Sequence, residues 1–530
     1  MQIAETEPVQ DTDINTIEPK KITNALISVF DKENLSSILK ELQSLGIKIY
    51  STGGTYQYIV DQHIEASKVE DLTGYPSILG GRVKTLHPKV FGGILGRRDQ
   101  QDDLDQLKEF DIPELDLVIV DLYPFEKTVA TETDEAAIIE KIDIGGISLI
   151  RAAAKNFKDV LIIPSVDDYS FLQNLLKKKQ GTSDLEDRKL MATRAFEVSS
   201  GYDTAIHNYF DKEEKEAFRQ SISESRKLRY GENPHQEAYF FGKLDDAFEQ
   251  LHGKEISYNN LVDIDGAINL IDDFINIVED RAVLAIIKHT NACGLAVRDT
   301  LIDSWKDALA CDSVSAFGGI IATNKTIDLE TAKAINEIFY EVLIAPAYDD
   351  EALTELMQKK KRTILKRKGS AIGMARPKQF KTLINGVVQQ DFDSFIQKAK
   401  DLTTVTETAP TDTEIRDLLF ANIAVKNLKS NAIALVKNEQ LVGCGVGQTS
   451  RVDALKQAID KAGKFKFDLK GAVMASDAFF PFPDCVEIAC DAGITSVLEP
   501  GGSIKDQESI DFCNKNKISM VFTGKRHFKH

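Results

Sequence analysis

Apolar segments of strand length alternate with amphipathic segments of helix length along the first third of the chain. Residues 31–45 have a helical pattern that stops at Gly46, a residue that commonly ends helices. A polar loop at 51–55 (STGGT) then leads into a second helical segment. Strands are predicted at residues 22–30, 47–50, 117–120 and 160–163. The repeated order of strand, polar loop and helix predicts a doubly wound α/β sheet.

The same alternation returns after residue 229, so a second α/β region is predicted there. Its predicted strands are 282–287, 432–436, 472–476 and 518–522, with an amphipathic helix at 452–462. Residues 211–228 are charged, helix-prone and poor in strand formers, which indicates a connection between two domains. The predicted parts are a disordered acidic tail at 1–20, a first domain at 21–210, a linker at 211–228 and a second domain at 229–530.

A faint internal repeat runs through the second region. Residues 312–318 (DSVSAFG) are similar to 476–480 (SDAFF), and 288–291 (KHTN) are similar to 429–431 (KSN). These similarities predict two stacked, similar subdomains.

Length and charge narrow the classes of function. A chain of 530 residues exceeds what one hydrophobic core usually supports, so two to four domains are expected. The net charge of −18 argues against nucleic acid as the main partner, because binding to a phosphate backbone needs a basic face. Residues 359–368 (KKKRTILKRK) are interpreted as a solvated helix end leading into a strand, with a nuclear signal or nucleic-acid patch as the alternative.

Cysteine and histidine spacing indicates neither disulfides nor a metal site. The six cysteines, all at or beyond Cys293, form no CxxC pair, which fits a reducing compartment. His235-Gln236-Glu237 matches half of the zinc deaminase signature, but the Pro-Cys-x-x-Cys half is missing. Cys485 and Cys490 are expected to be core thiols. Because no apolar segment approaches the roughly 20 residues that span a bilayer and residues 1–19 lack a targeting pattern, a cytoplasmic protein is expected.

Polar residues of the first region indicate a site for an anionic ligand. The loop at 52–55 (TGGT) offers two glycines and two hydroxyls before a helix, where free amides bind phosphate; an ordinary turn is the alternative. Lys84 follows 80–82 (GGR), and Lys155 follows an alanine-rich turn that leaves little cover for its charge. A lysine partly removed from water has a lowered pKa and exchanges protons near neutrality. Asp143 precedes two glycines and is a candidate to orient such a lysine or to hold a substrate amide.

A second set of polar residues opens the second region. Residues 229–236 (RYGENPHQ) combine donors, an aromatic ring and turn residues, which favours a polar, anionic, planar substrate. His289 follows the predicted strand 282–287, at the end where α/β proteins build active sites, although a lone histidine is more often structural. With Lys288 and Asn291 beside it, His289 is a candidate general base, and the lysine would counter negative charge on a carbonyl under attack.

Two arginines and a glycine-rich segment complete the candidates. Arg451 and Arg526 are candidate clamps for carboxylate or phosphate, because guanidinium matches these groups with two donors. Residues 443–447 (GCGVG) do not match the dinucleotide-binding fingerprint, since the third glycine comes one residue early and no acidic partner follows at the usual distance. A strand with close backbone packing is predicted there.

Seven strings of residues occur in the order found in one known family. They are GGRVKTLHP, IDIGG with RAAAKN, RYGENPHQ, KHTNACG, SAFGG, GQTSR and SDAFFPF. From about Lys21 to His530 the chain resembles the bifunctional family that joins phosphoribosylaminoimidazolecarboxamide (AICAR) formyltransferase to inosine monophosphate (IMP) cyclohydrolase. The resemblance implies an N-terminal domain like methylglyoxal synthase that closes the purine ring. It also implies two C-terminal cytidine-deaminase-like α/β subdomains without catalytic zinc, which move a formyl group from 10-formyltetrahydrofolate to AICAR.

The resemblance implies roles for individual residues and a homodimer with the formyl-transfer site between subunits. The cyclohydrolase nucleotide would be held by Ser28, Lys32, Thr52, Gly53, Gly54, Thr55, Arg82, Lys84 and Thr85, with Tyr123, Asp143 and Lys155 nearest the chemistry. Lys155 would be the proton donor and acceptor. AICAR would be held by Arg229, Tyr230, Gly318, Glu341, Asn431 and Arg451, and the folate by Phe479, Asp484, Ser503, Ile504 and Arg526. His289 would be the general base, assisted by Lys288.

The chain departs from the family pattern at three positions. Asp121 stands where Asn is usual, Glu341 where some members have Asp, and Ala292 where Pro is common. Asp121 places an extra anion beside a phosphorylated ligand, which weakens binding unless the carboxyl group is protonated or paired.

The residues alone leave two classes of function open. One is a transferase that acts on a phosphorylated planar metabolite, and the other is a non-catalytic nucleotide sensor. The acid–base candidates Lys84, Asp143, Lys155, Lys288 and His289 favour the enzyme, because a sensor needs phosphate contacts but no poised acids and bases. The expected partners are AICAR, formyl-AICAR, folate and a second copy of the chain, with no catalytic metal, nucleic acid or membrane.

Overall fold

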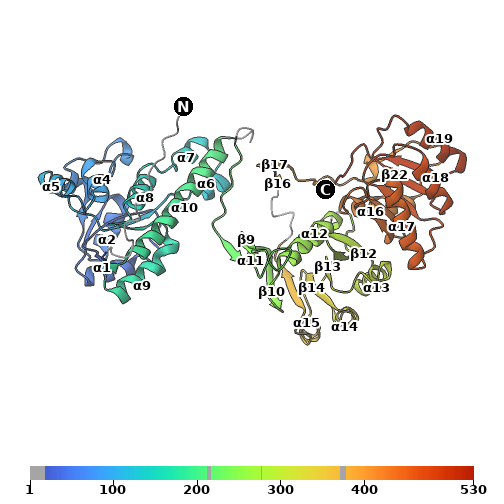
Figure 1. The fold of residues 1–530 in the computed structure, drawn as a ribbon, viewed down its shortest axis with the longest axis horizontal. Coiled ribbons are helices and arrows are strands. Elements are labelled where there is room, and N and C mark those ends of the chain that lie inside the picture. The colour runs from blue at the N-terminus through green and yellow to red at the C-terminus, as the bar shows by residue number, and fades with distance from the viewer. Residues whose placement is uncertain (1–17, 212–216, 276, 370–377) are drawn as a thin grey trace, which may run out of the picture. The chain divides into compact units, whose positions relative to one another are not determined.

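The computed structural model describes residues 18–211, 217–275, 277–369 and 378–530. They fall into two compact units, Met1–Ser223 and Glu224–His530, which Figure 1 colours from blue to green and from green to red. The boundary lies within the predicted linker 211–228, in which Ser225–Lys227 form strand β8. The predicted tail 1–20 lies outside the described residues up to residue 17, and Lys20 belongs to strand β1.

The first unit is built on a parallel sheet of five strands in the order β4-β3-β2-β5-β6, which confirms the predicted α/β architecture. These strands are β2 (Asn24–Val29), β3 (Lys48–Ser51), β4 (Ser67–Lys68), β5 (Leu117–Asp121) and β6 (Leu161–Ile163). A short ladder pairs β1 (Lys20–Lys21) with β7 (Thr182–Ser183). The helices are α1 (Leu35–Ser44), α2 (Gly53–Asp61), α3 (Val69–Thr73), α4 (Pro88–Leu95), α5 (Gln101–Glu109), α6 (Phe125–Thr131), α7 (Glu135–Ile139), α8 (Gly145–Lys155), α9 (Tyr169–Lys179) and α10 (Leu185–Phe210).

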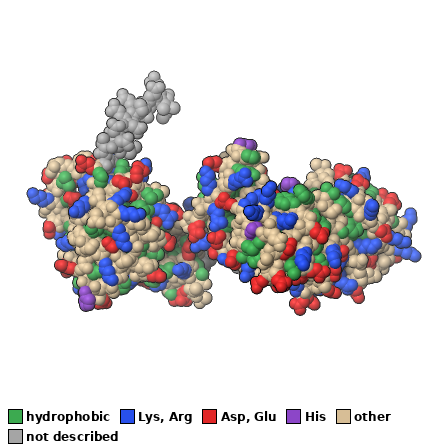
Figure 2. All heavy atoms as spheres, turned by 90° about the horizontal axis from the view of Figure 1, so that it is seen from below, with side chains coloured by type: hydrophobic (Ala, Val, Ile, Leu, Met, Phe, Trp, Pro, Cys, Tyr) green, Lys and Arg blue, Asp and Glu red, His purple; other side chains and the backbone are tan. Residues whose placement is uncertain are grey.

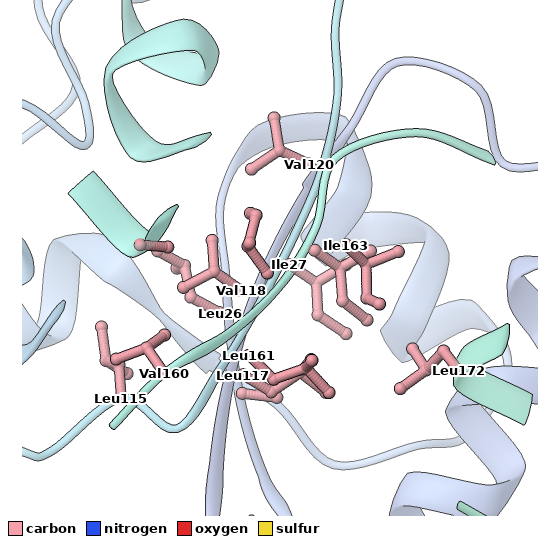
Figure 3. Packing of buried hydrophobic residues seen from close by; sticks show 14 of the residues in the cluster. Leu26, Ile27, Leu115, Leu117, Val118, Val120, Val160, Leu161, Ile163 and Leu172 are labelled. Carbon is pink, nitrogen blue, oxygen red and sulfur yellow. The ribbon is translucent and has the colours of Figure 1, made fainter. Parts of the chain in front are cut away.

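Buried aliphatic side chains hold the central strands of this sheet. Leu26 and Ile27 of β2, Val118 of β5 and Ile163 of β6 belong to one core cluster, to which Leu172 of α9 also contributes (Figure 3). A parallel sheet covered on both faces has strands that are apolar throughout, which is the pattern of the predicted runs.

Helix α1 begins four residues later than predicted. Asp31 is committed to a turn, because its Oδ1 accepts the Glu33 N–H at 2.8 Å and its own N–H donates to Asp121 at 2.8 Å. Asn34 then has a left-handed backbone with φ 61, which no helix contains. The helix therefore begins at Leu35 and leaves the polar turn at the end of β2.

The second unit contains a sheet of twelve strands, whose order is β10-β15-β14-β13-β11-β12-β20-β19-β21-β22-β23-β18. The elements of its first half are β10 (Phe248–His252), α12 (Tyr258–Ile275), β11 (Ala282–Lys288), β12 (Asn291–Arg298), α13 (Leu301–Cys311), β13 (Gly319–Thr323), α14 (Leu329–Ile335), β14 (Tyr340–Ala345), α15 (Asp350–Met357) and β15 (Thr363–Arg367). Those of its second half are β18 (Thr403–Thr404), α16 (Asp412–Lys426), β19 (Ile433–Lys437), β20 (Gln440–Gly445), α17 (Arg451–Lys464), β21 (Val473–Ser476), α18 (Asp484–Asp491), β22 (Ser496–Glu499), α19 (Asp506–Asn516) and β23 (Ser519–Phe522).

The two halves of this sheet have the same order of elements. Each has a helix, an antiparallel hairpin, and then three strands separated by helices, drawn in green to yellow and in orange to red in Figure 1. The hairpins meet edge to edge at the pair Ala296 and Gln440, so the halves share one sheet and the prediction that they are stacked is wrong. The proposed sequence repeat is also wrong in register. Residues 312–318 precede β13 while 476–480 begin at the last residue of β21, and 288–291 join β11 to β12 while 429–431 precede β19.

The remaining elements lie outside this repeat. Strand β8 pairs with β9 (Tyr239–Phe241), a short helix α11 (Leu244–Ala247) follows, and β16 (Lys378–Leu383) pairs with β17 (Gly386–Asp391). Among the described residues, no helix is long and apolar enough to cross a membrane. On the face shown in Figure 2, basic and acidic side chains lie interspersed over both units.

Candidate functional site

The polar loop at 52–55 lies where β3 ends and α2 begins, as its sequence position predicts. Thr52 is the N-cap of α2, and Gly53 has φ +55, a backbone angle that favours glycine. The Thr55 hydroxyl accepts the Val29 N–H at 3.1 Å and donates to the Val29 carbonyl at 2.9 Å. These bonds fix the first turn of α2 to the end of β2, so its free amides face a defined place at the carboxyl edge of the sheet.

Lys84 lies against this loop. A methyl group on Gly53 would come within 3.3 Å of Lys84 Nζ, and one on Gly81 within 2.9 Å of Lys84 Cε. Gly145, the first residue of α8, would likewise meet the Thr85 hydroxyl at 3.2 Å. The segment that carries Lys84 and Thr85 therefore packs between the N-termini of α2 and α8.

Asp143 closes this group of residues. Its Oδ1 accepts the Gly146 N–H at 2.7 Å, which ties it to the first turn of α8. Burial raises the pKa of the Asp143 carboxyl, while the Gly146 bond and the charge of Lys84 act in the opposite direction. Lys84, Thr85 and Asp143 are thus brought together, with a cation and a desolvated acid at the ends of two helices.

Tyr202 supports Asp143 and was not among the predicted site residues. Its hydroxyl accepts the Asp143 N–H at 2.9 Å and donates to the Lys141 carbonyl at 2.8 Å. Tyr202 is on α10, 59 residues away in the chain, so no local pattern links them. Tyr123, a predicted site residue, is partly exposed, with its ring centroid 5.1 Å from that of Phe30.

The residues at the ends of β2 and β5 form a second polar group. Lys32 Nζ donates to the Phe30 carbonyl at 2.9 Å, and Ser28 is half-buried on β2. Asp121 accepts the Asp31 N–H. Burial raises the pKa of the Asp121 carboxyl, the hydrogen bond from the Asp31 N–H lowers it, and the negative charge of Asp31 raises it. Arg82, by contrast, is exposed and forms an ion pair with Glu140, so its guanidinium points to a partner outside this group.

The environment of Lys155 differs from the one predicted for it. The prediction that its charge is partly removed from water is wrong, because the residue is exposed. It is the last residue of α8, and an eleven-residue helix is about 16 Å long, so Lys155 and the Asp143 group lie at opposite ends of the helix. Ala152, Ala153 and Ala154 face the core, whereas Arg151 and Lys155, four apart, share the exposed face.

In the second unit, Lys288 and Gly318 are neighbours at the end of β11. Lys288 Nζ donates to the carbonyls of Phe317 and Gly318, both at 2.9 Å. An ammonium group has three donors, so one remains for a ligand after these two bonds. Gly318 has φ +71, and a methyl group there would come within 3.0 Å of Lys288 Nζ.

His289 and Thr290 form the two-residue turn between β11 and β12. His289 is exposed, as a base that meets substrate must be, and Asn291 opens β12. The Asn291 side chain accepts the Lys429 N–H at 3.0 Å, so the 288–291 and 429–431 segments are in contact rather than equivalent. The Asn431 amide in turn donates to the Gln448 carbonyl at 3.0 Å, three residues before Arg451.

Arg451 lies at the start of α17 among carbonyl and carboxylate acceptors. Its guanidinium donates to Asp477 Oδ1 at 3.0 Å and to the Ala478 carbonyl at 3.2 Å. The guanidinium carbons of Arg451 and Arg526 lie 5.6 and 4.5 Å from the centre of the Phe528 ring, so both predicted clamps meet at one aromatic residue. The sequence analysis missed Phe528.

The predicted folate-side residues lie on two loops at the ends of neighbouring strands. Phe479 follows β21 and is partly exposed, and Ser503 and Ile504 follow β22, with Ile504 fully exposed. Glu499 joins these loops, because its carboxylate accepts the Phe480 N–H at 2.5 Å. Burial raises the pKa of Glu499 to about 8, and Asp506 adds to this. Asp484 is half-buried as the first residue of α18.

Arg229, Tyr230 and Glu341 make their contacts elsewhere in the second unit. The Arg229 guanidinium lies 5.4 Å from the centre of the Tyr230 ring, beyond the end of β8. Glu341, on β14, pairs with Lys254 at 3.4 Å. These three predicted AICAR contacts are thus not joined to the Lys288 or Arg451 groups by the contacts described above.

The other sequence interpretations have clear outcomes. Gly443 and Gly445 lie on β20, where an added methyl group would overlap the carbonyl oxygens of Ala458 and Ala454 on α17, which confirms a strand with close backbone packing. Cys485 is buried on α18, and Cys490 is partly buried there. Within the described residues, no group of three or more His, Cys, Asp or Glu side chains is arranged to hold a metal ion.

Two family models match this chain, and the matched segments meet inside the first unit. The model of the AICARFT/IMPCHase bienzyme family matches residues 153–461, and that of the MGS-like domain matches residues 34–148. A bifunctional purine biosynthesis protein of Bacteroides thetaiotaomicron is 59% identical over 97% of this chain and 100% of its own length. One of Acetivibrio thermocellus is 46% identical over 96% of this chain and 100% of its own length. A crystal structure of ForH covers 36% of this chain and 96% of its own at 36% identity, with a TM-score of 0.32.

The chain belongs to the AICARFT/IMPCHase bienzyme family. It is a bifunctional enzyme of purine biosynthesis, which transfers a formyl group from 10-formyltetrahydrofolate to AICAR and then closes formyl-AICAR to IMP with loss of water.

Proposed function

We propose that the first unit closes the ring and that the second unit transfers the formyl group, with domain limits at 21–210 and 229–530. The MGS-like match lies wholly in the first unit, and most of the bienzyme match lies in the second. Each unit has its own group of polar residues at strand ends, which supports two separate sites.

The proposed cyclohydrolase site centres on Lys84 and Asp143. The observation that supports it is the position of the Lys84 ammonium between the glycine loop of α2 and the desolvated carboxyl of Asp143. Ring closure joins the carboxamide nitrogen to the formyl carbon, and the adduct then loses water. Since an amide nitrogen is a weak nucleophile, a cation beside the formyl oxygen and a carboxylate that accepts the N–H proton of the amide both lower the barrier. The nucleotide would be held by Ser28, Lys32, Thr52, Gly53, Gly54, Thr55, Arg82 and Thr85, beside Tyr123.

Lys155 stays a prediction from the family resemblance as proton donor and acceptor. In its own chain it is separated from Asp143 by the length of α8. A direct role would therefore involve the far end of that helix, and the Lys155→Ala experiment in the Discussion addresses it.

The proposed formyl-transfer site centres on His289 and Lys288. In this step the AICAR amine attacks the formyl carbon, a new C–N bond forms, and the bond from that carbon to the folate N10 breaks. His289 accepts the amine proton, and the remaining Lys288 donor stabilises negative charge on the formyl oxygen. Arg229, Tyr230, Gly318, Glu341, Asn431 and Arg451 would hold AICAR, and Phe479, Asp484, Ser503, Ile504 and Arg526 would hold the folate.

A further part of the proposal, which rests on the family resemblance, is a homodimer in which two copies of the chain complete each formyl-transfer site. The reaction needs no catalytic metal, and the cytoplasm is the proposed location. The direct test is to mix the purified protein with AICAR and 10-formyltetrahydrofolate and to follow IMP, before and after thorough chelation. IMP formation that chelation leaves unchanged is expected; activity that vanished with chelation and returned with zinc would overturn the roles of Lys288 and His289.

A further inference from the structure

A carboxylate outside the roles assigned above holds the turn that carries His289. Asp263, on α12, accepts the Thr290 N–H at 2.6 Å. The pKa of Asp263 is raised by burial, while backbone hydrogen bonds from Thr290 and His289 and the charges of His289 and Lys288 act in the opposite direction. The half-buried carboxylate therefore lies directly against the backbone of the proposed base.

The turn has a backbone conformation that needs such support. His289 has φ 50 and Thr290 has φ 63, both in the left-handed region. Two-residue hairpin turns of this kind favour Asn and Gly, and a left-handed residue with a side chain costs about 1–2 kcal/mol. A hydrogen bond from a backbone N–H to a carboxylate is stronger than one between neutral groups, so the contact with Asp263 favours this conformation.

The second half of the sheet repeats the arrangement. Asp417, on α16, accepts the N–H groups of Asn438 at 2.9 Å and Glu439 at 2.6 Å. These two residues form the turn between β19 and β20, with φ 53 and 52. Helix α16 precedes β19 as α12 precedes β11, so the two aspartates are equivalent in the repeat. In this half the turn serves a structural contact, because Glu439 binds Arg281 at 2.6 and 2.8 Å.

We propose that Asp263 is a positioning residue for formyl transfer, which fixes the His289 backbone so that the imidazole stays beside Lys288 at the end of β11. The inference rests on the proposed role of His289. Asp417 holds its own turn in the same way, and that turn takes no part in the reaction. The repeat thus supplies a matched control within the chain.

The experiment compares Asp263→Ala, Asp263→Asn and Asp417→Ala in the full-length protein. Both half-reactions are assayed separately, with kcat and KM for AICAR and 10-formyltetrahydrofolate, together with thermal unfolding. We expect Asp263→Ala to lower kcat of formyl transfer about 10- to 100-fold, the effect of a misplaced catalytic group, with both KM values within about twofold. Asp263→Asn should recover most of kcat, because its amide oxygen still accepts the Thr290 N–H. Asp417→Ala should lower the unfolding temperature and leave kcat within about twofold.

Several outcomes overturn the proposal. They are an unchanged kcat in folded Asp263→Ala, equal losses of kcat in Asp263→Ala and Asp417→Ala, and a rise in KM without a fall in kcat. If Asp263→Ala does not fold, Asp263→Glu replaces it. The longer Glu side chain shifts the turn, so the same fall in kcat of formyl transfer is expected. An unchanged kcat in Asp263→Glu would reject the positioning role of Asp263. His289→Ala distinguishes failure of the proposed function from failure of the positioning role. Full formyl-transfer activity in His289→Ala would mean that His289 is not the base. Loss of activity in His289→Ala together with full activity in Asp263→Ala would reject only the positioning role of Asp263.

Discussion

The Lys84 ammonium group lies against the backbone of Gly53, where a methyl group on that glycine would come within 3.3 Å of Lys84 Nζ, closer than ordinary van der Waals contact. Gly53→Ala should therefore displace Lys84 and also impose a left-handed angle on alanine. We expect kcat/KM for ring closure to fall at least about tenfold, because a small misplacement of a catalytic group costs this much or more. Formyl transfer in the same protein should keep its rate, and the two half-reactions assayed separately give the measurement.

Gly74→Ala is the matched control for this experiment. Gly74 has φ +67, and nothing lies within 4 Å of an added methyl group. Both substitutions should lower stability by about 1 kcal/mol, since both force alanine into the left-handed region. If Gly74→Ala impairs ring closure as much as Gly53→Ala does, backbone strain and not Lys84 explains the loss.

The two chemistries should separate by single substitutions. From the family resemblance, Lys155→Ala should abolish ring closure and leave formyl transfer nearly intact, so that formyl-AICAR accumulates. The control is Lys158→Ala, which removes an exposed lysine three residues later. Because Lys155 is remote from Asp143 in its own chain, a loss confined to ring closure would show that the far end of α8 takes part in the reaction. An unchanged rate would leave Lys84 as the lysine of this site.

His289→Ala should have the opposite effect. Removal of a general base typically lowers a rate about a hundred- to ten-thousand-fold, so formyl transfer should fall by that amount while supplied formyl-AICAR is still closed to IMP. His63→Ala is the control, because His63 is also exposed and has a positive φ of 58. Equal losses in both half-reactions, after both variants are shown to be folded, would refute the assignment of one base to each unit.

Asp121→Asn should strengthen nucleotide binding in a way that depends on pH. Burial raises the pKa of Asp121, so its carboxyl is neutral over a wider acidic range than usual and becomes an anion as pH rises. The anion repels a phosphorylated ligand, whereas Asn still accepts the Asp31 N–H. We expect KM for formyl-AICAR to be several-fold lower in the variant at pH 8, and the difference to shrink toward pH 5. A KM ratio that is constant with pH would show that the charge of Asp121 does not reach the ligand.

Glu499 should make stability fall with rising pH. Burial raises its pKa from the usual value of 4.5 to about 8 in the folded protein, so the folded state binds the proton more tightly than the unfolded state. This contribution is fully present below the unfolded pKa and is lost as pH rises from about 4.5 through 8. Glu499→Gln keeps an acceptor for the Phe480 N–H and cannot ionise. Urea unfolding at pH 5, 7 and 9 measures the free energy of unfolding of both proteins. The value for Glu499→Gln should rise relative to that of the unmodified protein as pH rises.

Burial sets the direction of this effect, and two charged groups that face Glu499 modify its size. Asp506 raises its pKa and Arg451 lowers it, while Cys485 and Cys513 nearby have pKa values raised to about 12 and stay neutral over this range. Glu487→Gln, at an exposed position on α18, removes an equal charge as the control. A pH dependence that Glu499→Gln leaves unchanged would place the titrating group elsewhere.

Strand ends could be predicted from the sequence, because a buried parallel strand is a continuous apolar run that stops where polar residues begin. That reasoning located the 52–55 loop and His289 at strand ends. Lys155 was misjudged for a reason that the sequence contains: residues four apart share a helix face, and Arg151 already marks that face as exposed. The three alanines before Lys155 lie on the opposite, buried side of α8.

The rest depends on contacts between distant segments. Tyr202 reaches Asp143 across 59 residues, and Arg451 reaches Phe528 across three strands and two further helices, so neither contact leaves a local pattern. The repeat in the second unit is plain in the order of its elements, but the short strings that suggested it occupy different places in the two halves. A fold tolerates wide change of sequence as long as its hydrophobic pattern persists. The order of the elements therefore shows the repeat, whereas the residues of the two halves no longer do.

The two equivalent turns of the twelve-stranded sheet, 289–290 and 438–439, have different roles in the two halves. One turn presents an imidazole to solvent, and the other clasps Arg281 of the opposite half through Glu439. The first turn also touches its neighbour, through Asn291 and Lys429. Because the turn of one half holds the two halves together, the turn of the other half could exchange structural side chains for reactive ones without opening the sheet. The aspartate anchor is common to both turns, so the same backbone support serves a structural contact in one half and presents His289 to solvent in the other.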